Sequence, residues 1–130
     1  MQRTDHPDGT EVADFYVRAV RTGPFVFVSG TTSLDAKGNV QGTTAAEQTR
    51  VTMAKIEAAL GHASAGMDDL VRLTIYVTRI ADHAEVSAAL AQALPRRVTS
   101  TLVAVAALVK PELLVEIEAT AVTADKPSRA

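Results

Sequence analysis

Cysteine is absent from the sequence, so the chain forms no disulfide bond and offers no thiol for nucleophilic catalysis. Tryptophan is also absent, and aromatic residues make up only 4% of the chain. Because apolar residues still reach 47%, the core has to be built mainly from Ala, Val, Leu and Ile. The three histidines, His6, His62 and His83, lie far apart and show no metal-ligand spacing. We therefore expect neither a metal nor another cofactor.

An excess of basic residues is also missing. The 13 Lys and Arg residues face 15 Asp and Glu residues, which gives a formal net charge of −2. Nucleic-acid-binding proteins usually carry a basic stripe with interleaved aromatic residues, and neither feature is present. No apolar run is long enough to span a membrane, and Met1–Pro7 has no signal-peptide core. We expect a soluble cytoplasmic protein with no nucleic-acid or membrane partner.

The length of 130 residues suits one compact domain and is too short for two. Residues 1–10 are polar and contain Pro7 and Gly9, which favours an irregular arm. The polar residues 125–130 are expected to form a frayed tail. The sequence thus predicts a single domain over residues 1–130, with short flexible tails at about 1–10 and 125–130.

Hydrophobic periodicity predicts five strands and two helices. Gly23-Pro24 is a turn signal between the first two strands, and Thr44–Glu47 is a capping box that begins the first helix. Pro95 ends the second helix. The strands are expected at 15–22, 25–30, 70–78, 98–109 and 114–122, and the helices at 44–63 and 82–94. The order ββαβαββ predicts an α+β fold with two helices on one face of a sheet.

The strands at 25–30 and 98–109 are apolar along both of their faces. Two helices cover only one face of such a sheet, which leaves the second face without a partner. Large exposed apolar patches are rare on monomers, so we expect the chain to form an oligomer.

The last strand, 114–122, has two different faces. Val115 and Ile117 point toward the core, whereas Glu116 and Glu118 point the other way, roughly 7 Å apart. One interpretation is a solvated outer face of an antiparallel sheet. The other places one glutamate in a cleft, where it positions water or carries a proton. The strand alone leaves both open.

An ordered set of short segments resembles the Rid (YjgF) family of reactive-intermediate, or enamine/imine, deaminase-like proteins over roughly residues 12–123. The segments are Val26–Gly30, the Asp35–Gly38 turn, Gln48-Thr49, Ile56 with Leu60, Gly66, Asp69–Val71, Ile75–Thr78 and Val115–Ala119. The resemblance implies a chorismate-mutase-like α+β fold. It also implies a homotrimer in which the sheets form a central barrel and three clefts lie between subunits.

The resemblance further implies an activity. Deaminating members hydrolyse 2-imino or 2-enamino acids without a metal or cofactor. A glutamate on the last strand is associated with the attacking water, and a tyrosine from the N-terminal strand lines the cleft. These residues match Glu116 and Tyr16, and Gly30 matches the family's glycine at the cleft. Glu118 is then expected to be structural, paired with a cation such as Arg18 or Arg72.

One family residue is missing. In deaminating members an arginine grips the substrate carboxylate, but its position here holds Ser100, and the preceding proline is replaced by Val98. A guanidinium offers two charge-assisted hydrogen bonds, whereas a serine hydroxyl offers one neutral donor. The chain therefore resembles a subgroup that lacks the usual arginine.

Arg18 and Arg97 are the candidates to replace the missing arginine, with Ser100 and Thr101 as further substrate-binding residues. Other interpretations remain open. Arg18 would equally pair with a glutamate of the last strand, and Arg97 would be a solvated cation after a helix end.

The first functional hypothesis is a cofactor-independent hydrolase that deaminates an imine, an enamine or a related reactive small molecule, with water positioned by Glu116. The alternative is a trimeric small-molecule binding protein that has lost the chemistry. A third, an endoribonuclease, is disfavoured by the net charge of −2 and by the presence of only two tyrosines.

Overall fold

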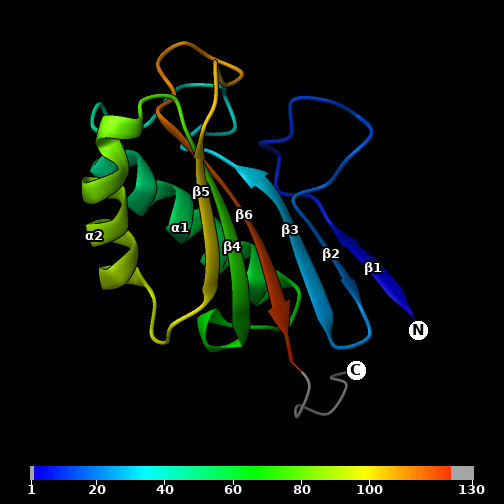
Figure 1. The fold of residues 1–130 in the computed structure, drawn as a ribbon. Coiled ribbons are helices and arrows are strands. Elements are labelled where there is room, and N and C mark those ends of the chain that lie inside the picture. Colours follow the sequence, from blue (N-terminus) through cyan, green and yellow to red (C-terminus); the bar gives the residue numbers. More distant parts are fainter. Residues whose placement is uncertain (1, 124–130) are drawn as a thin grey trace.

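A computed structural model describes residues 2–123. These residues form one six-stranded sheet, and two α-helices lie against one of its faces (Figure 1). The strands are β1 (Arg3–His6), β2 (Ala19–Thr22), β3 (Phe25–Thr31), β4 (Leu70–Val77), β5 (Thr99–Ala104) and β6 (Val115–Val122). The helices are α1 (Ala45–His62) and α2 (His83–Ala93). Two short 3-10 turns, η1 (Met67–Asp69) and η2 (Ile80–Asp82), directly precede β4 and α2. The predicted α+β fold class is confirmed.

The strand order in the sheet is β1-β2-β3-β6-β4-β5. Every neighbouring pair is antiparallel except β4 and β5, which are parallel and connected through α2. The last strand, β6, therefore inserts between β3 and β4. This topology brings the C-terminal strand against residues that lie about 90 positions earlier in the chain, near the end of β3.

Helix α1 begins where the sequence predicts. The Thr44 hydroxyl accepts the Glu47 N–H at 3.1 Å, and the Glu47 carboxylate accepts the Thr44 N–H at 3.0 Å. This reciprocal cap satisfies two amide groups that have no partner within the helix. From there Met53, Ile56 and Leu60 recur at helical spacing and are all buried against the sheet.

Strand β6 forms the centre of the core. Val115, Ile117 and Ala121 are fully buried on the side that faces the helices. Glu116 and Glu118 alternate with them and are only partly buried on the outer side. The period-two pattern of the sequence thus places both glutamates on the sheet face that has no helix.

The N-terminal region differs from the prediction. Arg3–His6 form β1, paired with β2, and not an irregular arm. The sequence gives no periodic signal there because the strand is polar and solvent-exposed on both sides. Residues 15–18 were expected in a strand, but β2 begins only at Ala19. The order is therefore βββαβαββ, and the tail predicted at 125–130 lies outside the described residues.

Two strands are less buried than their apolar sequences predict. The strand expected at 98–109 is shorter, because β5 ends at Ala104 and the chain continues as a loop. In β3, Val26 and Val28 are buried, but Phe25 and Phe27 are 38% and 48% exposed, so only one of its two apolar faces is buried within one chain.

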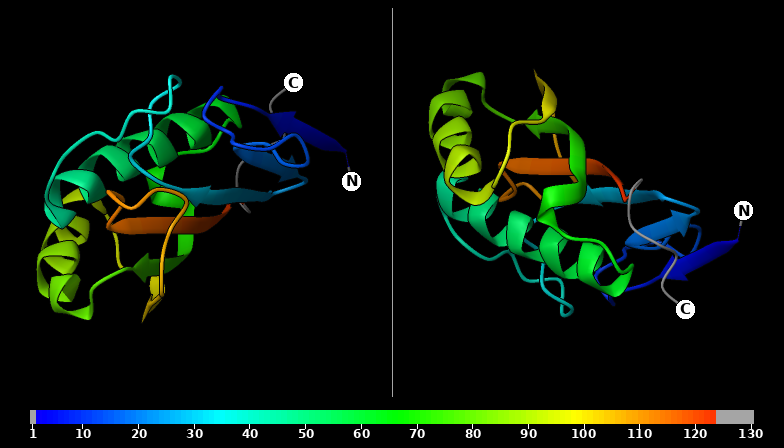
Figure 2. Two further views of the ribbon diagram at one scale, coloured as in Figure 1. Left: turned by 90° about the horizontal axis from the view of Figure 1, so that it is seen from above. Right: turned by 90° about the horizontal axis from the view of Figure 1, so that it is seen from below.

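The helices cover only one face of the sheet (Figure 2). The opposite face, which we call the outer face, carries Phe25 and Phe27 as a stacked pair with ring centroids 6.3 Å apart. Val71 and Val103 are also exposed. The uncovered apolar surface that the sequence implies is therefore present. Neither helix within residues 2–123 combines the length and apolarity needed to cross a bilayer.

Candidate active site

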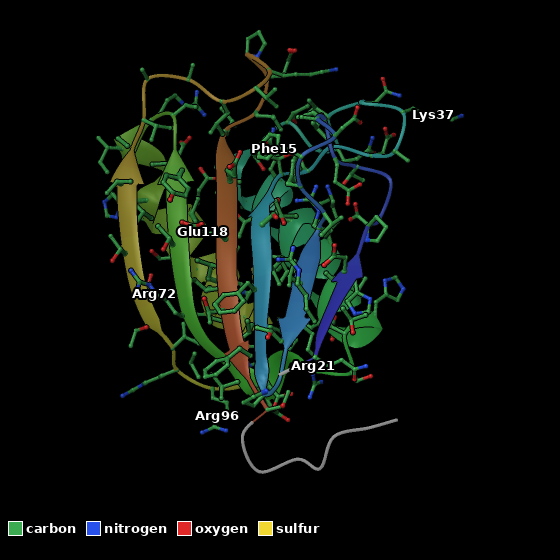
Figure 3. The ribbon with its side chains drawn as sticks, turned by 90° about the vertical axis from the view of Figure 1, so that its right-hand side faces the viewer. Phe15, Arg21, Lys37, Arg72, Arg96 and Glu118 are labelled. Carbon is green, nitrogen blue, oxygen red and sulfur yellow. The ribbon has the colours of Figure 1, made fainter. Side chains whose placement is uncertain are left out.

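A pocket of about 410 Å³ lies where β3 ends and β6 begins, beside the loop that precedes β2. Its lining includes four of the residues singled out from the sequence: Tyr16, Arg18, Gly30 and Glu116. Glu118 also reaches it. Figure 3 shows the outer face with Glu118 along β6 and Phe15 near the end of the sheet where the pocket opens. We call this cavity the Glu116 pocket.

Glu116 lies directly against Gly30. A Cβ atom added to Gly30 would sit 2.2 Å from the Glu116 Oε2 atom, so only glycine leaves room for the carboxylate in this position. Burial raises the pKa of Glu116; the nearby positive charge of Arg18 opposes this shift and the charge of Glu118 adds to it. Among residues 2–123 its carboxylate has no hydrogen-bond partner. Glu116 is therefore available to a bound water or ligand.

Glu118 is held by a different neighbour from the one expected. The Tyr76 hydroxyl donates a hydrogen bond of 2.5 Å to its Oε1 atom, and the same bond raises the pKa of Tyr76. No ion pair with Arg18 or Arg72 occurs within the described residues, so the expected cation partner is wrong. Tyr76 on β4 pairs directly with Glu116 on β6. Its long side chain reaches diagonally to Glu118, two residues further along β6.

Arg18 is buried, with only 2% of its surface exposed. Its guanidinium donates to the Gly30 carbonyl at 2.7 Å, to the Thr31 hydroxyl at 3.2 Å and to the Thr10 hydroxyl at 2.9 Å. Its Nε atom lies 3.3 Å from the Asp8 carboxylate. The suggestion that Arg18 pairs with a glutamate of the last strand is therefore wrong. The side chain ties the N-terminal loop to β3.

Tyr16 lies in the loop before β2, not on a strand face shared with Arg18. Its hydroxyl oxygen accepts the Val12 N–H at 2.9 Å, which leaves the hydroxyl proton free to be donated. The ring stands 5.8 Å from the Arg18 guanidinium and 5.2 Å from the exposed Phe15 ring. Tyr16 thus presents a hydrogen-bond donor at the rim of the pocket.

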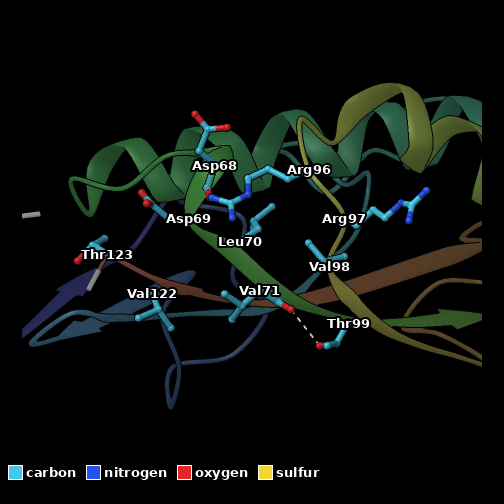
Figure 4. Close-up of a pocket in the computed structure, with 10 residues that line it drawn as sticks. All are labelled: Asp68, Asp69, Leu70, Val71, Arg96, Arg97, Val98, Thr99, Val122 and Thr123. Carbon is cyan, nitrogen blue, oxygen red and sulfur yellow. Dashed lines mark hydrogen bonds between the residues drawn. The ribbon is translucent and has the colours of Figure 1, made fainter. Parts of the chain in front are cut away.

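Arg97 lies elsewhere, in a larger pocket of about 660 Å³ at the opposite end of β4 and β6 (Figure 4). Arg96 donates to the Asp68 carbonyl at 3.4 Å, whereas the Arg97 side chain points away from Asp68 and Asp69. Both arginines are exposed. Partly desolvated groups mark functional sites better than exposed ones do, so the smaller Glu116 pocket is the stronger candidate site.

Ser100 and Thr101 lie on β5, at the edge of the sheet, and line neither pocket. Ser100 pairs with Leu73 and Thr101 pairs with Thr74. This register places Thr101 on the outer face and Ser100 on the helix face. Within one chain, neither hydroxyl is beside Glu116.

Sequence reasoning missed Lys55. Its amine donates to the carbonyls of Thr32 and Leu34 at 2.8 and 2.7 Å, and so fixes a loop that lines the Glu116 pocket. Burial, followed by the charge of Arg18, lowers the pKa of Lys55 to about 8. Lys55 lies off the buried stripe of α1, and nothing in the sequence around it indicates that its amine is partly buried. Only the tertiary contact with the 32–34 loop reveals its role.

The arrangement suits acid–base chemistry with water. A half-buried carboxylate of raised pKa can accept a proton, and a tyrosine hydroxyl can donate one. Across residues 2–123, no three His, Asp or Glu side chains gather as metal ligands would.

We expect Glu116→Gln to raise the melting temperature by about 2 °C at pH 7, with no gain near pH 4. The folded-state pKa of Glu116 lies above its ordinary value of 4.5. The folded state therefore favours the protonated form, and the stability that this gives is lost as pH rises through the raised pKa. Glutamine is uncharged at both pH values, so the variant does not lose this stability between pH 4 and pH 7. Thermal melts at both pH values measure the difference.

Glu118→Gln should instead lower the melting temperature at pH 7, because it weakens the charge-assisted acceptor of the Tyr76 hydroxyl. Tyr76→Phe supplies the matched control, because it removes the same hydrogen bond from the other side. In a Tyr76→Phe background, adding Glu118→Gln should lower the melting temperature much less than it does in the wild type. A larger loss for Glu116→Gln than for Glu118→Gln would reverse these roles.

The sequence of residues 8–123 matches a protein-family model described as endoribonuclease L-PSP. The chain is 45% identical to Mycobacterium tuberculosis Rv2704, described as a member of the YjgF/YER057c/UK114 family, with a TM-score of 0.84 over 93% of this chain and 99% of that one. It is 26% identical to E. coli TdcF, whose crystal structure has bound serine, with a TM-score of 0.78 over 90% and 92%. A RutC family protein from Pyrococcus abyssi is 26% identical over 107 residues, 82% of this chain and 84% of the relative.

Proposed function

The chain belongs to the endoribonuclease L-PSP family, also described as YjgF or Rid, and on that basis we propose that the Glu116 pocket hydrolyses an imine, an enamine or a related reactive small molecule. The observation that carries the proposal is the state of Glu116. Its carboxylate is partly buried, has a raised pKa and lies against Gly30 without a protein partner among the described residues. Such a group suits the activation of water.

The chemical step needs only water and a proton transfer. Glu116 would accept a proton as the water oxygen bonds to the imine carbon. Tyr16, whose hydroxyl proton is free, would donate toward the nitrogen. As the resulting aminoalcohol collapses, Glu116 returns its proton to the departing nitrogen and the hydroxyl proton of the aminoalcohol goes back to Tyr16. The carbon–nitrogen bond breaks, ammonia and a carbonyl compound are released, and both residues regain their starting protonation.

The test uses imines generated in solution by flavin-dependent oxidation of an amino acid or of an amine, with semicarbazide as a competing trap. Active protein should lower the semicarbazone yield in proportion to its concentration, and Glu116→Gln should abolish the effect. Glu57→Gln is the matched control, because it removes the same charge from an exposed position on α1. If no imine is consumed faster, the alternative holds: a small-molecule binding protein that has lost the chemistry.

The alternative has its own support. The crystal structure of TdcF contains bound serine as a ligand, so a relative of this chain binds a small molecule. In the present chain Ser100 stands where deaminating members are expected to carry an arginine, and it does not line the Glu116 pocket. We do not extend the proposal to ribonuclease activity, because two carboxylates in the pocket would repel a phosphate backbone.

We also propose that the protein is a homotrimer joined through the outer face. The exposed Phe25–Phe27 pair and Val103 on that face have no cover within the chain. Light scattering should give three times the monomer mass, and Phe27→Lys should dissociate the assembly by placing a charge in the contact. Ile80→Lys, at an apolar position in η2 that is 58% exposed and does not line the Glu116 pocket, is the control. A monomer mass for the wild type would contradict the proposal.

Activity on short 2-imino acids should be weak in the wild type, and Ser100→Arg should raise it about tenfold or more. An arginine restores a bidentate, charge-assisted partner for the carboxylate. Because Ser100 is remote from Glu116 in one chain, this gain requires a second copy to bring β5 to the pocket. Ser100→Lys is the control, since lysine adds a positive charge but lacks the paired N–H donors of a guanidinium. Efficient hydrolysis of 2-iminobutyrate by the wild type would contradict the expectation.

A further inference from the structure

The Glu116 pocket is lined by more negative than positive side chains. Glu116 and Glu118 both line it, and Arg18 is the one lining cation among the described residues. The Arg18 side chain is only 3% exposed and is already paired with Asp8 at 3.3 Å. Lys55, the next cation, points its amine at two backbone carbonyls. The charge left to act on a ligand is therefore negative.

Hydrogen-bond donors for an anion are also scarce in the Glu116 pocket. The Ser29 hydroxyl donates to a backbone carbonyl at 2.7 Å, and the Thr10 hydroxyl donates to Asp8 at 2.7 Å. Three of the Arg18 N–H groups are committed to protein oxygens, and the buried Nε atom faces the Asp8 carboxylate. The remaining hydroxyl donors that line the pocket, those of Tyr16 and Thr32, are neutral. A carboxylate entering the pocket would lose hydration, and Arg18, its one cationic neighbour among the described lining residues, is already paired with Asp8.

The mouth of the pocket is apolar. Phe15, Val12 and Val109 line it and are 89%, 61% and 58% exposed, and Leu34 lies deeper and is buried. A ligand that places a charged nitrogen beside the glutamates can therefore bury a small hydrocarbon group against these side chains.

From these charges, donors and apolar side chains we infer that the Glu116 pocket selects a cationic nitrogen ligand without a carboxylate, such as a protonated imine or amine with a small apolar substituent. The inference rests on the proposed function only in taking this pocket as the substrate site. It goes further in excluding simple 2-imino acids as the preferred substrates.

Three stable probes test the charge selection at equilibrium. Propylamine, butyrate and 2-aminobutyrate share a three-carbon chain. Propylamine carries an ammonium group on it, butyrate carries a carboxylate, and 2-aminobutyrate carries both. Titration calorimetry of the full chain should show propylamine binding at least tenfold more tightly than either of the others. Amide NMR shifts at Ser29 and Gly30 should locate it in the pocket.

The Glu116→Gln variant should weaken propylamine binding about tenfold, whereas Glu57→Gln should leave it unchanged. Tighter binding of 2-aminobutyrate or butyrate would overturn the inference, as would failure of propylamine to bind or equal losses in the two variants. Binding does not require turnover. If propylamine binds as expected and no imine is hydrolysed, the proposed function fails alone. If 2-iminobutyrate is hydrolysed through Glu116 and 2-aminobutyrate binds better, the inference fails alone.

Discussion

Gly30→Ala should reduce turnover at the Glu116 pocket by about a hundredfold or more while leaving the chain folded. A Cβ atom at this position would lie 2.2 Å from Glu116 Oε2 and 3.0 Å from its Cδ, so the carboxylate has to leave its present place. The atoms that must move belong to the end of a flexible side chain, and the backbone of Gly30 does not have a positive φ. The cost to folding should therefore be small.

The matched control is Gly66→Ala, where an added Cβ meets nothing within 4 Å. Both variants should melt close to the wild type, and only Gly30→Ala should lose activity and ligand binding. Full activity of a folded Gly30→Ala protein would show that the position of Glu116 beside β3 is irrelevant to the chemistry.

Arg18→Met should cost about 3–5 kcal/mol of unfolding free energy, the largest stability loss expected from a single change in the site. It removes three hydrogen bonds and leaves the Asp8 carboxylate without its cation. Urea unfolding monitored by circular dichroism measures the loss. The double variant Asp8→Asn with Arg18→Met should recover part of it, because no uncompensated charge remains.

The same pair predicts a pH dependence. Burial alone would raise the pKa of Asp8, but hydrogen bonds from Thr10 and the charge of Arg18 hold it below its ordinary value of 3.8. The Thr10 hydrogen bonds and the Arg18 charge together therefore stabilise the fold above about pH 4, and this contribution is lost as pH falls through the lowered pKa of Asp8. The stability of the Arg18→Met variant should change less with acid than that of the wild type. Parallel curves would mean that the ion pair contributes little.

Where a residue's partner is local, the sequence predicted it well. The capping box at Thr44 needs only residues three positions apart, and the alternation of β6 follows from strand geometry. The same alternation placed both glutamates on the outer face, and the resemblance singled out Glu116 and Gly30, which the structure brings into direct contact.

Partners distant in the chain were not predictable in the same way. Nothing in the sequence around Arg18 indicates that Asp8 and Thr10 fold back over it, because the intervening loop has no periodic pattern. The Tyr76 contact with Glu118 depends on β4 pairing with β6, which lie 42 positions apart at these residues. Strand β1 was missed because its stability comes from backbone pairing along an exposed edge and not from apolar burial.

The most direct test of the central claim is the pH dependence of kcat/KM for imine hydrolysis, corrected for the uncatalysed rate. If Glu116 activates the water, the rate should fall in acid with an apparent pKa above the ordinary glutamate value of 4.5, and Glu116→Gln should show no catalysed rate at any pH. A catalysed rate in the Glu116→Gln variant, with the acid limb unchanged, would show that another group carries the chemistry.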